Sequence, residues 1–136
     1  MEILIIDDEA IIENIITAFC DQYAKESVLT INRTCISDPV RALYELVTRG
    51  EQFDVVTLDV RMPGLVGDLI FETLMDSHPH LIGKILFVTG YKEDLLWRFP
   101  DVDLNVLTKP FNYTKFKKSI EVILAKNVTE LRKHGT

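Results

Sequence analysis

The chain has little cysteine, little basic charge and no long hydrophobic run, and each shortage excludes a class of protein. Cys20 and Cys35 are the only cysteines among 136 residues, which is too few for a disulfide scaffold, and neither has metal-ligand spacing. We expect both to be reduced packing residues of a cytoplasmic protein. The formal net charge of -6 argues against direct binding to nucleic acid, because that contact requires a basic face.

The first apolar run, from Ile3 to Ile6, has only four residues before Asp7, Asp8 and Glu9 follow. It lacks the basic start and the longer apolar region of a signal peptide. No other run reaches membrane-spanning length, so we expect no membrane association. With 47% hydrophobic and 26% charged residues, the composition is typical of a single globular domain.

What the sequence does contain is a regular alternation of short apolar runs and amphipathic stretches. The patterns predict strands at 3–6, 29–33, 55–58, 85–90 and 105–108, and helices at 10–23, 40–47, 66–75, 93–99 and 111–124. Beyond residue 125 the helical pattern thins. Each crossover between parallel strands needs a helix, so the alternation predicts an α/β fold in which a five-stranded, doubly wound parallel sheet carries helices on both faces.

Polar residues stand at the ends of four predicted strands. Asp7 and Asp8 follow the first strand, Asp59 ends the third, Thr89 ends the fourth, and Lys109 follows the fifth. The carboxyl ends of parallel strands meet at one edge of the sheet, so we expect these five residues to be neighbours. Three carboxylates in one place repel unless a cation lies among them, and hard oxygen ligands suit Mg²⁺.

This set indicates phosphoryl chemistry. An aspartate that attacks phosphorus forms an acyl phosphate, and Asp59 is the predicted nucleophile because it ends the central third strand. Asp7 and Asp8 would bind the metal from the side, Lys109 would pair with Asp59 and then with a phosphoryl oxygen, and Thr89 would donate its hydroxyl.

Each residue alone has a simpler interpretation. Asp59 could only end a strand at a turn, Asp7 and Asp8 could cap a helix, Thr89 could be an ordinary strand end, and Lys109 could be a solvated charge. The five residues together favour the phosphoryl-transfer hypothesis.

These motifs closely resemble the receiver domain of two-component response regulators, of the chemotaxis-regulator kind. The resemblance runs from Ile3 to about Leu124. It rests on Ile5-Ile6-Asp7-Asp8-Glu9, the Asp-x-x-Met-Pro-Gly-x-x-Gly pattern of Asp59 to Gly67, Val88-Thr89-Gly90 and Lys109-Pro110-Phe111. It implies a flavodoxin-like sheet of strand order 2-1-3-4-5, a receiver domain over residues 1–126, and a C-terminal helix extension or tail over residues 127–136.

Carried over residue by residue, the resemblance makes Asp59 the phosphoacceptor, with a histidine kinase or histidine phosphotransfer protein as donor. Asp8 and Asp59 then resemble the side-chain ligands of Mg²⁺ (or Mn²⁺). Asp7 would bind the metal through water, and the backbone carbonyl of Arg61 would add an oxygen.

The resemblance also makes Thr89 the switch hydroxyl and Lys109 the phosphate-binding lysine, with a cis bond before Pro110. One position departs from the family, which usually has Tyr or Phe three residues before the lysine. This chain has Val106, and a small β-branched side chain cannot swing a ring between surface and core.

We therefore expect the signal to leave through the loop from Thr89 to Tyr91 and the helix after it, with Tyr91 or Trp97 as reporters. Arg61 and Tyr91 stand where the family tunes hydrolysis of the phosphoryl group. Simple surface exposure explains both residues equally well.

The family usually docks its effectors on the face made by the fourth helix, the fifth strand and the fifth helix. The resemblance therefore implies a downstream effector on that face, with a homodimer as a further option and no direct contact with nucleic acid. The chain is either a stand-alone receiver or one excised from a longer regulator or hybrid kinase.

Two other classes compete with this interpretation. A phosphohydrolase of the haloacid dehalogenase type also uses an aspartate nucleophile with Mg²⁺, but it needs a general acid two residues later, where this chain has Arg61. A flavin or nucleotide binder would have a glycine-rich loop where Asp7 and Asp8 stand. We therefore expect that the chain is not an enzyme acting on a separate substrate. It would catalyse only the transfer of a phosphoryl group to its own Asp59 and the hydrolysis of that group.

Overall fold

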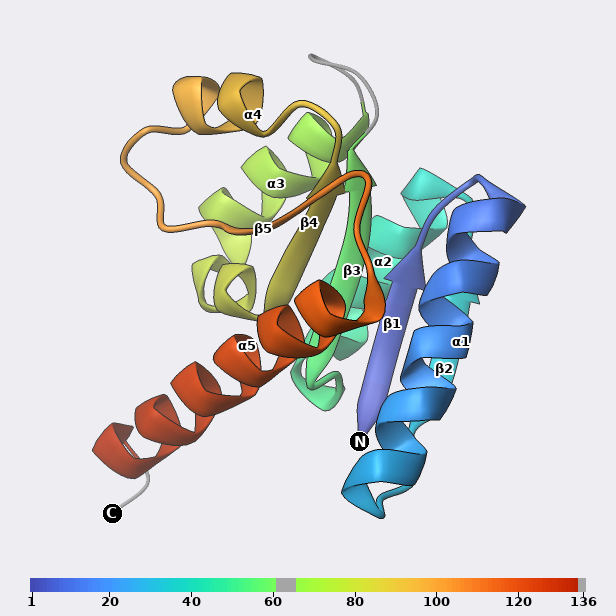
Figure 1. The fold of residues 1–136 in the computed structure, drawn as a ribbon. Coiled ribbons are helices and arrows are strands. Elements are labelled where there is room, and N and C mark those ends of the chain that lie inside the picture. The colour runs from blue at the N-terminus through green and yellow to red at the C-terminus, as the bar shows by residue number, and fades with distance from the viewer. Residues whose placement is uncertain (61–65, 135–136) are drawn as a thin grey trace.

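The computed structural model describes residues 1–60 and 66–134 (Figure 1). The described chain alternates strands and helices in the order β1 (Glu2–Ile6), α1 (Ala10–Ser27), β2 (Asn32–Ile36), α2 (Pro39–Arg49), β3 (Val55–Val60), α3 (Val66–Ser77), β4 (Ile85–Thr89), α4 (Lys92–Arg98), β5 (Asn105–Thr108) and α5 (Tyr113–His134). Short 3₁₀ turns at Gly50–Gln52 and Pro79–Lys84 precede β3 and β4.

The described strands form one parallel sheet of order β2-β1-β3-β4-β5. This confirms the predicted doubly wound, flavodoxin-like fold. Side chains alternate along each strand, so the core divides into two layers. Alternate strand residues pack with α2, α3 and α4 on one face, and the remaining strand residues pack with α1 and α5 on the other. In Figure 1, α1 and α5 lie in front of the sheet and α2 lies behind it.

The central strands are buried on both faces, which explains their continuous apolar runs. Ile3, Leu4 and Ile5 of β1 are fully buried, and so are all five residues of β4. Because these strands are pinned from both sides, their carboxyl ends are held firmly at one edge of the sheet.

The strand predicted at 29–33 is displaced, because β2 begins at Asn32. Val28 ends α1 in the left-handed conformation, at φ 52° and ψ 50°, and its N–H donates to the carbonyl of Ala24. The N–H of Leu29 donates to the same carbonyl at 3.1 Å. Leu29 therefore belongs to the helix end rather than to the strand.

The helix α5 reaches His134, so the segment expected over residues 127–136 as a helix extension or tail is helical through residue 134. One further expectation differs from the structure. Cys35 is exposed on the edge strand β2 rather than packed, whereas Cys20 is buried, and both are free thiols. In residues 1–60 and 66–134, no helix combines the length and apolar character needed to cross a bilayer.

Candidate functional site

The candidate site lies at the carboxyl ends of β1, β3, β4 and β5, at the top of the sheet in Figure 1. Asp7 and Asp8 directly follow β1. Asp59 is the fifth residue of β3 and stands opposite Val88 of β4, while Thr89 ends β4. Lys109 comes one residue after β5. The structure therefore brings all five predicted residues to one edge.

Three carboxylates converge there. Asp7, Asp8 and Asp59 each place one oxygen within 4.8 Å of the others. Asp7 is 4% exposed, the side chain of Asp59 is 2% exposed, and Asp8 is open to solvent. A hard divalent cation such as Mg²⁺ prefers these donors and fills its remaining positions with water and phosphate oxygens. The donor set fits that ion, and the solvent exposure of Asp8 gives it access from one side.

The acids are electrostatically unfavourable without a cation. Burial raises the pKa of Asp7 from its ordinary 3.8 to about 7, and the neighbouring Asp59 carboxylate adds to the rise. The N–H of Glu9 donates to Asp7 at 2.7 Å and opposes the shift. Glu9 is the N-cap residue of α1, so the helix start orients Asp7 towards the acid cluster.

Lys109 supplies positive charge to the same place. Its Nζ lies 2.7 Å from Oδ1 of Asp59, and its side chain is only 24% exposed. The backbone N–H of Lys109 donates to the carbonyl of Thr89 at 2.8 Å. The Lys109–Pro110 bond is cis, as the resemblance implied. This ammonium can neutralise charge on Asp59 or on a group attached to it.

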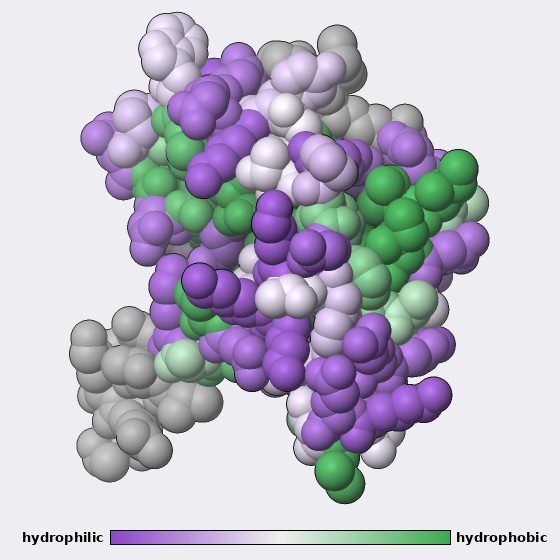
Figure 2. All heavy atoms as spheres, in the orientation of Figure 1, coloured by the Kyte–Doolittle hydropathy of each residue, from purple (hydrophilic) through white to green (hydrophobic). Residues whose placement is uncertain are grey.

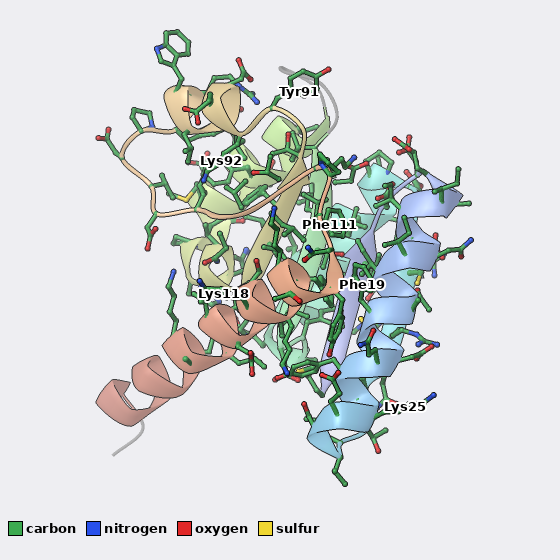
Figure 3. The ribbon with its side chains drawn as sticks, viewed as in Figure 1. Phe19, Lys25, Tyr91, Lys92, Phe111 and Lys118 are labelled. Carbon is green, nitrogen blue, oxygen red and sulfur yellow. The ribbon has the colours of Figure 1, made fainter. Side chains whose placement is uncertain are left out.

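Thr89 is fully buried, and its hydroxyl oxygen accepts a hydrogen bond from the N–H of Tyr91 at 2.9 Å. The side chain of Tyr91 is 53% exposed and lies at the site edge, pointing away from the sheet (Figure 3). Trp97, on α4, is 80% exposed. Arg61, with its expected carbonyl ligand and tuning role, lies outside the described residues.

Val106, which stands where the family usually has Tyr or Phe, lies beside a cluster of aromatic side chains in the core. Val106 stands opposite Phe87 in the sheet and is partly buried against the α2, α3 and α4 layer. Two other rings fill that layer, since Phe99 lies 4.2 Å from Phe71, centroid to centroid, and Phe71 lies 5.8 Å from Phe87. The aromatic packing in this layer therefore comes from α3, β4 and the end of α4.

Sequence reasoning missed the contact between the Lys109 loop and α1. Phe111 follows the cis peptide, and its ring lies 6.0 Å from the ring of Phe19 on α1 in an edge-to-face arrangement. Figure 3 shows the two side chains between α5 and α1. The sequence feature that indicates a contact here is the aromatic residue directly after Lys109-Pro110. Its partner on α1 cannot be predicted from the sequence, because it depends on how the helices pack. The contact ties the lysine loop to the helix that follows Asp7 and Asp8.

Solved structures with the same fold include a response regulator receiver domain protein from Clostridium thermocellum. It is 21% identical, with a TM-score of 0.76, and the match covers 94% of this chain and 97% of that one. The receiver domain of a sensor histidine kinase from Pseudomonas aeruginosa PAO1, described with magnesium coordinated in its active site cleft, is 17% identical with a TM-score of 0.72. That match covers 91% of this chain and 97% of that one.

Two curated relatives match parts of the chain. The sensor kinase CckA from Brucella abortus (strain 2308) is 34% identical over 89 residues, which are 64% of this chain and 9% of the kinase. A response regulatory protein from Vibrio cholerae serotype O1 is 32% identical over 71 residues, which are 52% of this chain and 29% of that protein. The chain thus aligns with less than a third of either relative.

The family model of the response regulator receiver domain matches residues 3–121, nearly the whole of the sheet and its helices. The match includes Asp7, Asp8, Asp59, Thr89 and Lys109, the residues that the fold gathers at one edge. It favours a receiver over the haloacid dehalogenase type of hydrolase. The chain belongs to the response regulator receiver domain family.

Proposed function

We propose that Asp59 accepts a phosphoryl group from a histidine kinase or a histidine phosphotransfer protein in the cytoplasm. The observation that carries this proposal is the position of Asp59, which is shielded from solvent, held by Lys109 at 2.7 Å, and within 4.8 Å of the oxygens of Asp7 and Asp8. A carboxylate in this setting has a cation beside it and room for a metal next to the incoming group.

In the proposed reaction, a carboxylate oxygen of Asp59 attacks phosphorus, and the bond between phosphorus and the donor imidazole nitrogen breaks. The imidazole leaves with the electron pair of that bond and takes up a proton. Lys109 pairs with Asp59 before the transfer and with a phosphoryl oxygen after it, so its charge stabilises both states.

Asp8 and Asp59 would hold Mg²⁺ or Mn²⁺ directly and Asp7 through water, with the backbone carbonyl of Arg61 as a further ligand. When bound, the ion neutralises charge on the phosphoryl oxygens. The chain would catalyse only the transfer to Asp59 and the hydrolysis of its own acyl phosphate.

The signal would leave through Thr89. Its hydroxyl is the group that would donate to the phosphoryl oxygens, and that movement would disturb the loop to Tyr91 and then α4. Tyr91 and Trp97 are the natural reporters, since both are exposed, and Val106 carries no ring for the usual read-out. Tyr91 is also a candidate for tuning hydrolysis, together with Arg61. Effector docking on α4, β5 and α5 would follow.

The test is the mass of the intact protein after incubation with Mg²⁺ and acetyl phosphate. We expect the wild type to gain one phosphoryl group and Asp59→Asn to gain none. Asp54→Asn is the matched control, because Asp54 precedes the same strand at its opposite end, where it accepts a hydrogen bond from the N–H of Glu2 at 2.8 Å. Absence of labelling in the folded wild type, or labelling of Asp59→Asn, would refute the assignment.

The hydrolase alternative is tested in parallel. Steady release of phosphate from an ordinary phosphomonoester, at a rate unaffected by the donor used above, would show turnover of a separate substrate. We expect none, because the general acid of such enzymes has no counterpart at Arg61.

A further inference from the structure

Phe19, on α1, lies at the centre of a group of aromatic rings. Its ring is 6.0 Å from that of Phe111 and 5.6 Å from that of Tyr113, both edge to face, and 5.5 Å from that of Phe116. Phe116 is fully buried on α5, whereas Phe111 comes from the loop that joins β5 to α5. One side chain of α1 therefore contacts both that loop and the start of α5.

The helix that carries Phe19 is firmly seated. Ile16 and Cys20 are buried and pack α1 against the sheet, and the hydroxyl of Tyr113 donates to Oε2 of Glu26 at 2.7 Å, which links α5 to α1. In Figure 2, hydrophobic side chains reach the surface along the upper part of α1 and in the seam between α1 and α5, while the outer face of α5 is mostly hydrophilic. The side chains of the seam are only partly covered, so they are held mainly by their contacts with one another.

The Lys109 loop, residues 109–112, is held on both sides of its lysine. On one side, the backbone N–H of Lys109 donates to the carbonyl of Thr89 at 2.8 Å. On the other side, only Pro110 separates Lys109 from Phe111. The proline ring fixes φ at that residue, so a displacement of Phe111 is passed on to the backbone of Lys109.

We propose that Phe19 is a positioning residue of the phosphoryl transfer: through the ring of Phe111 it holds the Lys109 loop where the ammonium reaches Oδ1 of Asp59, at 2.7 Å. This role rests on the proposed function, in which Asp59 accepts the phosphoryl group. The ring contributes no charge to the site. It acts through geometry, because the ammonium stabilises the phosphoryl oxygens only where it lies beside them.

The same helix also supports the acids, which allows a specific test. The N–H of Glu9, the N-cap residue of α1, donates to Asp7 at 2.7 Å. General loosening of α1 would therefore disturb the acid cluster and weaken Mg²⁺ binding. Loss of the contact between Phe19 and Phe111 alone would displace Lys109 and leave the acids in place.

The rate of labelling is followed by intact mass during incubation of the full chain with saturating Mg²⁺ and acetyl phosphate. We expect Phe19→Leu to gain the phosphoryl group about tenfold more slowly than the wild type, with no weakening of Mg²⁺ binding by calorimetry. Phe19→Tyr keeps the ring and should label within about twofold of the wild-type rate. Tyr23→Leu is the matched control, because it removes a buried ring one turn further along α1, and it should label like the wild type.

NMR of the lysine ammonium groups observes Lys109 without any phosphoryl donor, and its signal is assigned by its loss in Lys109→Met. We expect this signal to move in Phe19→Leu and in Phe111→Leu, and to stay in place in Tyr23→Leu. Because the two ring variants break the same contact, combining them should slow labelling no further than either does alone. Circular dichroism checks that each variant folds, and Phe111→Leu carries the test should Phe19→Leu not fold.

Three results would overturn the proposal: an unmoved Lys109 signal, equal labelling rates of Phe19→Leu and Tyr23→Leu, or slower labelling of Phe19→Leu accompanied by weaker Mg²⁺ binding. If the wild type itself gains no phosphoryl group, the proposed function fails instead. The Lys109 signal alone then decides whether Phe19 sets the position of this lysine.

Discussion

Replacing Val28 by glycine should stabilise the protein, although it removes a side chain. Among the residues that the structure describes, Val28 is the non-glycine residue with a positive φ, at 52°. It is 91% exposed. A β-branched residue is strongly disfavoured in this conformation because its side chain crowds the following carbonyl. The side chain therefore contributes strain and almost no buried surface.

The expected gain follows from two opposing terms. Relief of the left-handed conformation is worth roughly 1–2 kcal/mol, while the added freedom of glycine in the unfolded chain costs about 0.4–1 kcal/mol. The hydrogen bond from the N–H of residue 28 to the carbonyl of Ala24 is a backbone contact, so the substitution keeps it. We expect Val28→Gly to raise the free energy of unfolding by about 1 kcal/mol.

Urea denaturation followed by circular dichroism measures this change. Val122→Gly is the matched control, since Val122 is an exposed valine within α5, 43% exposed. The same substitution should destabilise there by roughly 0.5–1 kcal/mol, because glycine is a poorer helix former than valine and the buried part of the side chain is lost. If both variants lose stability alike, the strain assigned to Val28 is refuted.

Three further outcomes follow from the core and the site. Burial raises the pKa of Asp7, so the folded protein holds this proton more tightly than the unfolded chain does. In magnesium-free buffer, the free energy of unfolding of the wild type should therefore fall relative to that of Asp7→Asn as the pH rises from 3.8 to about 7. Urea titrations of both proteins measure this difference, and a difference that does not change with pH would contradict the assignment. A Cβ at Gly50 would stand 2.6 Å from Cδ1 of Leu81, a buried side chain, so Gly50→Ala should cost about 1–3 kcal/mol on chemical denaturation; an unchanged midpoint would show that Leu81 yields. Burial raises the pKa of the Cys20 thiol to about 12, so iodoacetamide should label Cys35 alone in the folded protein and both thiols in urea, as mass spectrometry would show.

The buried strands were predictable because a strand covered on both faces needs an unbroken apolar run. This held for the central strands β1, β3 and β4, whereas the edge strand β5, with the sequence Asn-Val-Leu-Thr, was recognised by the Lys109-Pro110 turn that follows it. The edge strand β2 was misplaced, because its sequence Asn-Arg-Thr-Cys-Ile leaves only Ile36 buried and carries no comparable pattern. The end of α1 at Val28 could not be predicted either, since valine is among the last residues expected in a left-handed turn.

The gathering of the site residues was predictable from topology, because parallel strands all end at one edge. Their individual contacts were not. The hydrogen bond between the Thr89 hydroxyl and the Tyr91 N–H depends on a side-chain rotamer, and the contact of Phe111 with Phe19 depends on how two distant helices pack. Such details arise from tertiary structure that no local pattern encodes.

The hydrogen bond that Thr89 accepts from Tyr91 also limits how sharply the molecule can respond. If the hydroxyl turns towards a phosphoryl oxygen, it exchanges a neutral hydrogen bond, with a net worth of about 1 kcal/mol, for one to a charged acceptor that is worth roughly 1.5–3 kcal/mol. A difference of about 1–2 kcal/mol favours one orientation of the hydroxyl by roughly five- to thirty-fold, so a minor population of the other orientation remains. The average position of the loop should therefore shift gradually with the fraction of molecules that carry the phosphoryl group.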